Sequence, residues 1–271
     1  MKTLKLLGAA LAAVTMTFTA QAEKTAKAVL ENDGKTLRFV YDEMNYGTRG
    51  THWFSVAEAE AIDPHKKVVS WHYYCCGTVT NVVFDSSFAA YRPKQCGCWF
   101  LEFGVLAAVD GLKNLNTSVA TNMAYMFTRC WALKSLNVSG FNTANVTDMC
   151  CMFDSCSSLT TLDLTGFDTA NVTDMGYMFY RCSSLEEICV SDRFVTDQVS
   201  YSSGMFEYCS KLKGGAGTAY DSDKIDKAYA HIDGGPSAPG YFTQKGQQDC
   251  QGRGRGRRRD AQVRLRQPRL R

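Results

Sequence analysis

The stretch GFDTANVTDMGYMFYRCSSL, residues 166–185, decides the fold because it is one copy of a unit that recurs along the chain. A closely similar copy, GFNTANVTDMCCMFDSCSSL, occupies residues 140–159. Both contain a Met-Phe pair followed at fixed spacing by a Cys and a Leu, and this pattern recurs at offsets of 26, 26 and 27 residues. A fixed period of this length is typical of repeat proteins, whose units stack on one another.

The apolar residues of each unit fall at relative positions that match one side of a helix. Counted from Met175 they lie at 0, 3, 4, 7 and 10, which predicts a helix of about three turns. Polar residues just before each helix are expected to cap its first turn, namely Asn145, Thr147, Asp148, Asn171, Thr173 and Asp174. The positions predicted to form the structural core of the repeats are Met126, Phe127, Cys130, Leu133, Met152, Phe153, Cys156, Leu159, Met178, Phe179, Cys182, Leu185, Met205, Phe206, Cys209 and Leu212.

A short strand is expected after each helix, because Leu162 and Leu164 alternate with polar residues. The fold class predicted is therefore an α/β repeat, a short leucine-rich-repeat-type solenoid. It has one short strand and one short helix per 26-residue unit and a β-rich N-terminal cap. The polar residues of neighbouring strands would share one exposed face, which is a candidate binding surface unless it is only a solvated sheet face. They are Ser135, Asn137, Ser139, Thr161, Asp163 and Thr165.

Residues 167–185, with the Leu-Asp-Leu of residues 162–164 before them, resemble the repeat of the BspA-like leucine-rich-repeat surface proteins of bacteria. Residues 82–93 and 111–118 are similar to the lead-in of that family, and residues 232–243 to its closing segment. The resemblance implies a secreted or surface-exposed protein, and for some members adhesion to host matrix proteins, other bacteria or epithelial cells. It supplies no shared catalytic residues.

Composition divides the chain into segments of different character. Residues 23–243 hold 18 basic and 25 acidic side chains, a net charge of −7, whereas residues 244–271 hold ten basic and two acidic ones, a net of +8. No stretch after the first 22 residues approaches the roughly 20 apolar residues that a membrane span needs. The expected segments are a signal peptide (1–22), a β-rich cap (23–105) with strands at 36–41, 68–74 and 79–84, repeats (106–215), a closing segment (216–243) and a basic disordered tail (244–271).

Twelve cysteines allow several kinds of chemistry, of which buried structural thiols are favoured for the repeats. The repeat cysteines lie at inward positions, where Cys acts as a small hydrophobe, although inter-coil disulfides are an alternative. Other pairs could form disulfides in an exported chain. A metal site built from Cys96, Cys98, His72 and Cys75 or Cys76 lacks the usual zinc-ligand spacing, so no metal and no cofactor are predicted.

The sequence favours a binding protein rather than an enzyme. None of the four histidines, His52, His65, His72 and His231, lies in a nucleophile motif. The expected partner is a protein or glycan, with host matrix or another bacterial surface as candidates, and not a nucleic acid. Two alternatives stay open: a structural or assembly component of the cell surface without a soluble ligand, and an accessory module of a secreted hydrolase with His72 and Cys75 as its candidate site.

Overall fold

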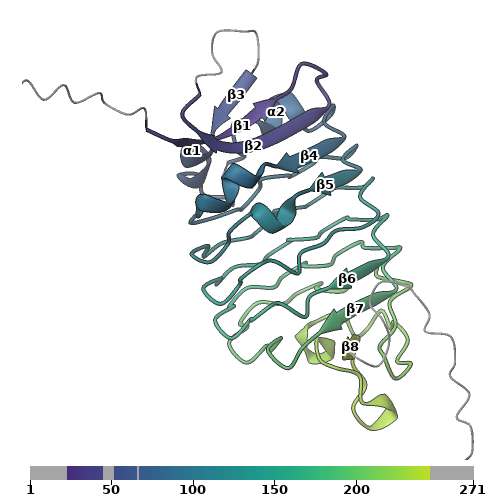
Figure 1. Ribbon diagram of the computed structural model, residues 1–271. Coiled ribbons are helices and arrows are strands. Elements are labelled where there is room, and N and C mark those ends of the chain that lie inside the picture. The colour runs from purple at the N-terminus through teal and green to yellow at the C-terminus, as the bar shows by residue number, and fades with distance from the viewer. Residues whose placement is uncertain (1–22, 45–51, 66, 245–271) are drawn as a thin grey trace, which may run out of the picture.

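The computed structural model describes residues 23–44, 52–65 and 67–244 as a stack of coils (Figure 1). The predicted signal peptide and residues 245–271 of the predicted basic tail lie outside the described residues. The described residues form two sheets, one ordered β3-β1-β2-β4-β5 and one ordered β6-β7-β8. The strands are β1 (Thr25–Leu30), β2 (Thr36–Asp42), β3 (His52–Ser55), β4 (Asn81–Phe84), β5 (Ala108–Asp110), β6 (Thr161–Asp163), β7 (Glu187–Val190) and β8 (Phe242–Gln244).

The N-terminal strands join an antiparallel group to the first coils. β1 pairs with β2 and β3 in antiparallel fashion, whereas β2 pairs with β4 and β4 with β5 in parallel. The strand predicted at 36–41 is confirmed by β2, and the one at 79–84 is confirmed in part by β4. The strand predicted at 68–74 is wrong, because α2 (His72–Cys75) follows Trp71 there. The Trp71 indole N–H donates to the Trp99 carbonyl at 2.7 Å, which holds this turn against the first coils.

The predicted fold class is wrong in its central element, because the repeats contain no α-helix in the part of the chain that the structure describes. The α-helices described there are α1 (Val56–Glu60) and α2, both before the repeats. The remaining helical elements are short 3₁₀ turns: η2 (Ser86–Ala90), η3 (Leu112–Asn114), η4 (Lys227–Tyr229) and η5 (Gly235–Ser237). The repeats are sheet and turn structure rather than helix and strand.

Two tight turns replace each predicted helix. In the 140–159 copy the Met152 amide donates to the Met149 carbonyl and the Cys156 amide to the Phe153 carbonyl, at 3.2 and 3.1 Å. The third residue of each turn, Cys151 or Ser155, has a positive φ, 55° and 57°. That is the geometry of a type II turn. Successive turns bring side chains inward every three or four residues, so their spacing imitates that of a helix.

The amides that a helix would use internally bond instead to the next coil. The backbone N–H groups of Met149, Cys151, Phe153 and Ser155 donate to carbonyls 25 residues further along, at 2.7–3.0 Å. Parallel bridges continue this pairing through the stack, joining residues 95, 122, 148, 174 and 201. The amides of residues 149–156 thereby all find a partner, which is the condition that any alternative to a helix must satisfy.

Several of the polar residues expected to cap helices instead form hydrogen bonds to the backbone of a neighbouring coil. The Asn171 amide nitrogen donates to the Ala144 carbonyl at 2.8 Å, and the Thr173 hydroxyl donates to the Thr147 carbonyl at 3.1 Å. The Asp174 carboxylate accepts the amide of Gly176, two residues on, at 2.9 Å. The capping interpretation is therefore wrong, although it identified residues that bond to backbone.

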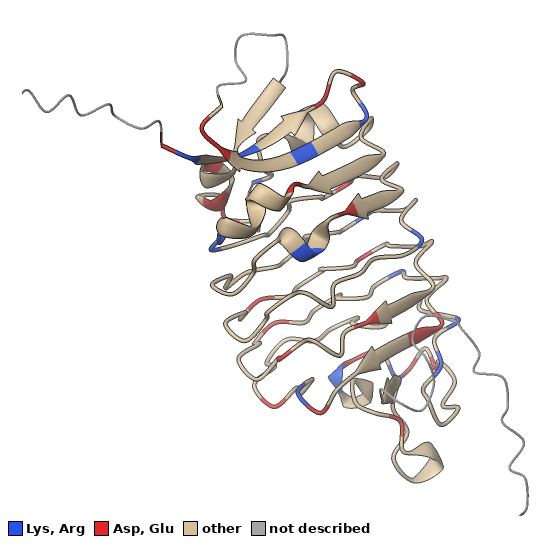
Figure 2. Cartoon of the chain, in the orientation of Figure 1, with Lys and Arg blue, Asp and Glu red and all other residues tan. Residues whose placement is uncertain are grey.

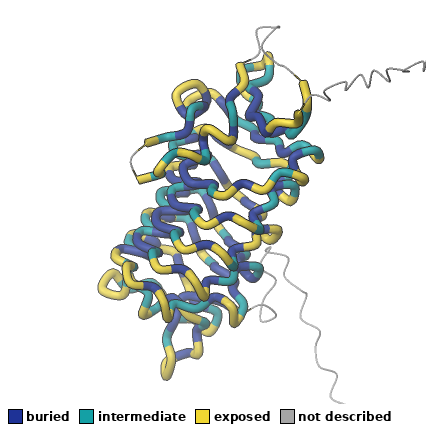
Figure 3. The backbone as a smooth tube through the Cα atoms, turned by 90° about the vertical axis from the view of Figure 1, so that its left-hand side faces the viewer, coloured by how far each residue is buried: buried dark blue, intermediate teal, exposed yellow. Residues whose placement is uncertain are grey.

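The sixteen residues predicted for the repeat core all lie in the interior, which runs unbroken along the stack (Figure 3). Phe127, Phe153, Phe179 and Phe206 form a column with ring centroids 5.6–6.0 Å apart and nearly parallel planes. Beside it, each repeat thiol donates to a phenylalanine carbonyl one coil back, as from Cys156 to Phe127 at 3.2 Å. Cys130, Cys156, Cys182 and Cys209 are free thiols, whereas Cys189 is disulfide-bonded.

The substitution Gly204→Ala distinguishes the turns from a helix, because it should change the free energy of unfolding in opposite directions in the two structures. Gly204 has φ of 61°, and an added Cβ would lie 2.6 Å from the Tyr177 ring. We expect Gly204→Ala to lower the free energy of unfolding by about 1–2 kcal/mol, since left-handed backbone disfavours a side chain. A helix would gain about 1 kcal/mol from the same change.

Gly77 is the matched control for this measurement. It has no atom within 4 Å of an added Cβ and no positive φ, so Gly77→Ala should be neutral or slightly stabilising. Denaturant unfolding of both variants gives the comparison. Stabilisation by Gly204→Ala would contradict the turn geometry.

The repeat thiols should resist alkylation in the native protein. Burial raises the pKa of Cys156 and of Cys209 to about 12, so the reactive thiolate is scarce near neutral pH. We expect mass spectrometry after iodoacetamide treatment at pH 8 to find the four repeat cysteines unmodified until denaturant is added. Rapid native modification of any of them would show that the column is open to solvent.

Candidate binding surface

The predicted polar residues occupy one side of the stack, but the backbone under them is not uniform. β6 pairs with β7 and β7 with β8, so Thr161 and Asp163 lie on a regular three-stranded sheet. Within the described residues, no backbone hydrogen bond joins segment 134–137 to the coils beside it. The strand side is therefore divided into two sheets, with Ser135 and Asn137 in the irregular segment between them.

Several of the predicted side chains are used to form turns. The Asp163 carboxylate accepts the Thr165 amide at 3.0 Å and the Thr165 hydroxyl at 2.6 Å, and Asn137 accepts from Ser139 in the same way. Thr165 is buried, Thr161 and Asp163 are half-buried, and Ser135, Asn137 and Ser139 are exposed. Thr161 is the predicted residue that lines a cavity.

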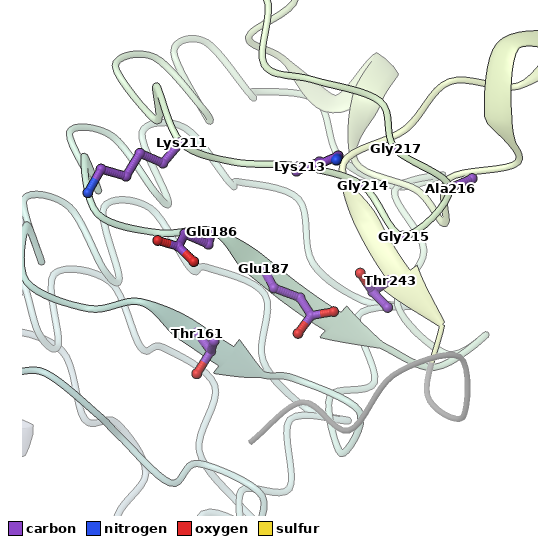
Figure 4. A pocket seen from close by; sticks show the side chains of 10 residues that line it. All are labelled: Thr161, Glu186, Glu187, Lys211, Lys213, Gly214, Gly215, Ala216, Gly217 and Thr243. Carbon is purple, nitrogen blue, oxygen red and sulfur yellow. The ribbon is translucent and has the colours of Figure 1, made fainter. Parts of the chain in front are cut away.

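A cavity of about 770 Å³ lies at the end of the strand side where β7 and β8 meet (Figure 4). We call it the strand cavity. It is lined by Thr161, Glu186, Glu187, Lys211, Lys213, Gly214, Gly215, Ala216, Gly217 and Thr243. Figure 4 shows Lys211 and Thr243 at opposite ends, with Glu187 on β7 between them. The surrounding coils carry both signs of charge (Figure 2).

The strand cavity holds two carboxylates and two ammonium groups that form no ion pair with one another among the described residues. Glu186, Lys211 and Lys213 are exposed, and Glu187 is half-buried. The Thr243 hydroxyl is buried and has no hydrogen-bond partner in the described part of the chain. Unsatisfied buried polar atoms are costly, so a cavity that contains one is suited to a polar ligand.

Asp233 fixes the loop that forms one wall of the strand cavity. Its carboxylate accepts the amides of Ala216, Thr218 and Gly235 at 2.9 Å and the Thr218 hydroxyl at 2.8 Å. Burial by itself raises the pKa of Asp233, but the hydrogen bonds from Thr218 and Gly235 outweigh it and lower the pKa to about 2. The ionised carboxylate is therefore the form that holds residues 214–217 in place.

The sequence pattern did not predict most residues of the strand cavity, although some of them lie at positions that the repeat register indicates. A step of 26 residues leads from Ser135 to Thr161 and another to Glu187, and the 27-residue step of the last repeat leads from Glu186 to Lys213. The predicted row ended at Thr165, before the two units that contain Glu187 and Lys213, because the motif degenerates after residue 185. Thr243 gives no such signal, since it joins the sheet from the closing segment through β8.

The candidate chemistry in the N-terminal segment is occupied by structural contacts. The His72 ring Nδ1 lies 2.9 Å from the Leu101 carbonyl, and burial raises the pKa of the Cys75 thiol to about 12. The Cys98 thiol donates to the Pro64 carbonyl at 3.3 Å. Over the described ranges, no three His, Cys, Asp or Glu side chains form a group that could hold a metal. The hydrolase alternative thus lacks a reactive thiolate at Cys75.

His65 takes part in a contact that the sequence did not indicate. Its Nε2 lies 2.8 Å from the Asp148 carboxylate, and its Nδ1 lies 3.4 Å from the Tyr125 hydroxyl. Asp148 also accepts from the Asn122 amide at 3.0 Å. This network fastens the N-terminal segment to the edge of the coils.

Comparison with known proteins finds one family. A model described as "Mycoplasma protein of unknown function, DUF285" matches residues 100–219, so the coils are similar to that family. Neither the curated proteins nor the solved structures contain a match to the chain. Within residues 23–44, 52–65 and 67–244, no helix is long and apolar enough to span a bilayer.

Asp233→Asn should remove a pH-dependent part of the stability. Because the folded pKa lies below the unfolded value near 3.9, the stabilisation is present above about pH 4 and is lost as the pH falls toward 2. We expect Asp233→Asn to lower the free energy of unfolding at pH 7 by about 2 kcal/mol and to flatten its decline below pH 4. Parallel pH profiles for the two proteins would contradict this role.

Proposed function

We propose that this protein is a secreted or cell-surface binding protein that attaches to a partner protein through its strand side. The observation that carries the proposal is the strand cavity, in which Glu187 and Lys213 form no ion pair with any residue that the structure describes and lie beside a buried hydroxyl. Fixed charges of both signs favour a partner segment with complementary charges and reject one with the opposite arrangement. Polar groups placed within a preformed hollow are what binding sites generally contain.

Two features of the sequence support an exported protein of this kind. The first 22 residues have a basic start, an apolar middle and an Ala-Gln-Ala exit, as signal peptides do. The repeat unit resembles that of the BspA-like surface proteins, some of which take part in adhesion. On this basis host matrix or another bacterial surface is the partner to test first.

The test compares the full-length protein with the double variant Glu187→Gln/Lys213→Gln on immobilised matrix proteins and mucins. We expect the double variant to bind at least ten-fold more weakly, because both charged contacts are lost while the backbone of β7 is retained. Glu58→Gln/Lys94→Gln is the matched control, since it removes one charge of each sign from exposed positions in the N-terminal segment. Circular dichroism checks that each variant is folded.

The salt dependence of binding distinguishes this interaction from binding of polyanions by the basic segment of residues 253–271. Polyanion binding weakens steeply with salt, whereas a partly enclosed pair of contacts is screened less. Binding that persists at high salt and depends on Glu187 and Lys213 supports the proposal. Equal binding by the double variant and the control would refute it.

A further inference from the structure

A second cavity, of about 500 Å³, lies on the turns of the coils. It is lined by Trp131, Ser155, Ser157, Arg181, Ser183 and Tyr208, and we call it the turn trough. It shares no lining residue with the strand cavity. The turn trough therefore requires an explanation of its own.

The repeat register explains why this surface is hollow. One column of equivalent positions contains Trp131, Ser157 and Ser183, and a second contains Ser155, Arg181 and Tyr208. Serines are small, so the coils between the large side chains leave a depression. From the coil of Trp131 to that of Tyr208 there are three coil spacings, roughly 14 Å at the usual strand separation.

Large aromatic side chains stand at both ends of the turn trough. Trp131 is 50% exposed and Tyr208 is 52% exposed. A Cβ added to Gly104 would lie 2.5 Å from the Trp131 indole, so the glycine lets the ring lie against the backbone of the preceding coil. The indole is thus supported while half of its surface stays open, and a supported platform loses little entropy on binding.

Arg181 gives the turn trough a positive charge of fixed position. Its guanidinium carbon lies 5.0 Å from the centre of the Tyr180 ring and 5.5 Å from that of Tyr208. No carboxylate forms an ion pair with Arg181 in the described part of the chain, and the nearby Asp154 accepts the Ser155 hydroxyl at 2.7 Å. A guanidinium held by stacking keeps its N–H donors available for a carboxylate.

We propose that the turn trough binds a short acidic saccharide, with sugar rings stacked on Trp131 and Tyr208 and a carboxylate on Arg181. Saccharides combine apolar C–H faces, which pack on aromatic rings, with hydroxyls, which exchange hydrogen bonds with serine side chains. The three kinds of group in the trough match the three kinds in a carboxylated sugar. The lining residues of the trough come from four successive coils, which favours a chain of sugars over a compact ligand.

This site goes beyond the proposed attachment through the strand side and does not depend on it. The two sites use different residues. Changes at Trp131 and Arg181 therefore report on saccharide binding alone. Changes at Glu187 and Lys213 report on the protein partner.

Calorimetry with the full-length protein tests the assignment, with short oligogalacturonate as the acidic probe and maltohexaose as the neutral one. We expect Trp131→Ala to weaken oligogalacturonate binding at least ten-fold. Arg181→Gln should weaken oligogalacturonate binding by a similar factor without changing the response to maltohexaose. Trp131→Phe should restore much of the affinity, because it keeps an aromatic face.

Two matched controls use residues outside the turn trough. Trp53→Ala removes another exposed indole, and Arg193→Gln removes another exposed guanidinium, and neither should alter the affinity. Thermal unfolding of each variant verifies the fold. The assignment is wrong if no saccharide binds, if Trp131→Ala and Arg181→Gln bind as the parent does, or if a glutamate-rich peptide is the probe that depends on Arg181.

Discussion

The structure depends on backbone hydrogen bonds that run from one coil to the next. Alternate amides of each repeat, such as those of Cys151 and Phe153, donate hydrogen bonds to carbonyls of the following coil rather than to carbonyls of their own segment. The arrangement requires a left-handed residue in each turn, which costs roughly 1–2 kcal/mol for a residue with a side chain. The phenylalanine column and the buried thiols offset this cost, because they bury apolar surface at every coil.

The same register that fixes the core also places the surface groups. Equivalent positions of successive coils form columns, so the side chains of a column determine whether the surface is flat, charged or hollow. On the strand side the column from Thr161 leads to Glu187, and Lys213 follows Glu186 in the next coil, beside the cavity. On the turns, serines between Trp131 and Tyr208 leave the second hollow. Both candidate sites are thus places where the sequence departs from the repeat, and at the strand cavity the backbone departs from it as well, through the loop of residues 214–217 and through β8.

The sequence predicted the period, the inward residues and the polar side, because these follow from spacing alone. It did not predict the path of the backbone. Positions 0, 3, 4, 7 and 10 fit a helix and fit two consecutive type II turns equally well, since both bring side chains inward every three or four residues. Gly176 and Gly204 were the available signal, because glycine is unfavourable inside a helix and suited to a turn.

The candidate sites were predictable only in part, for a related reason. Glu187 and Lys213 lie on the predicted register, but Thr243 reaches the cavity through β8, whose pairing with β7 has no counterpart in the repeat. The position of the exposed Trp131 indole depends on its contact with Gly104 in the preceding coil. Such contacts between units with different residues are not contained in the pattern of a single unit.

Nuclear Overhauser spectroscopy of the labelled protein tests the inter-coil hydrogen bonding most directly. The Phe153 amide lies 2.9 Å from the Met178 carbonyl, so its proton should show cross-peaks to residues 178 and 179 in the next coil. The account predicts such long-range contacts at alternate residues of the 149–155 segment. Strong sequential amide contacts together with contacts from each α proton to the amide three residues on would indicate a helix and contradict it.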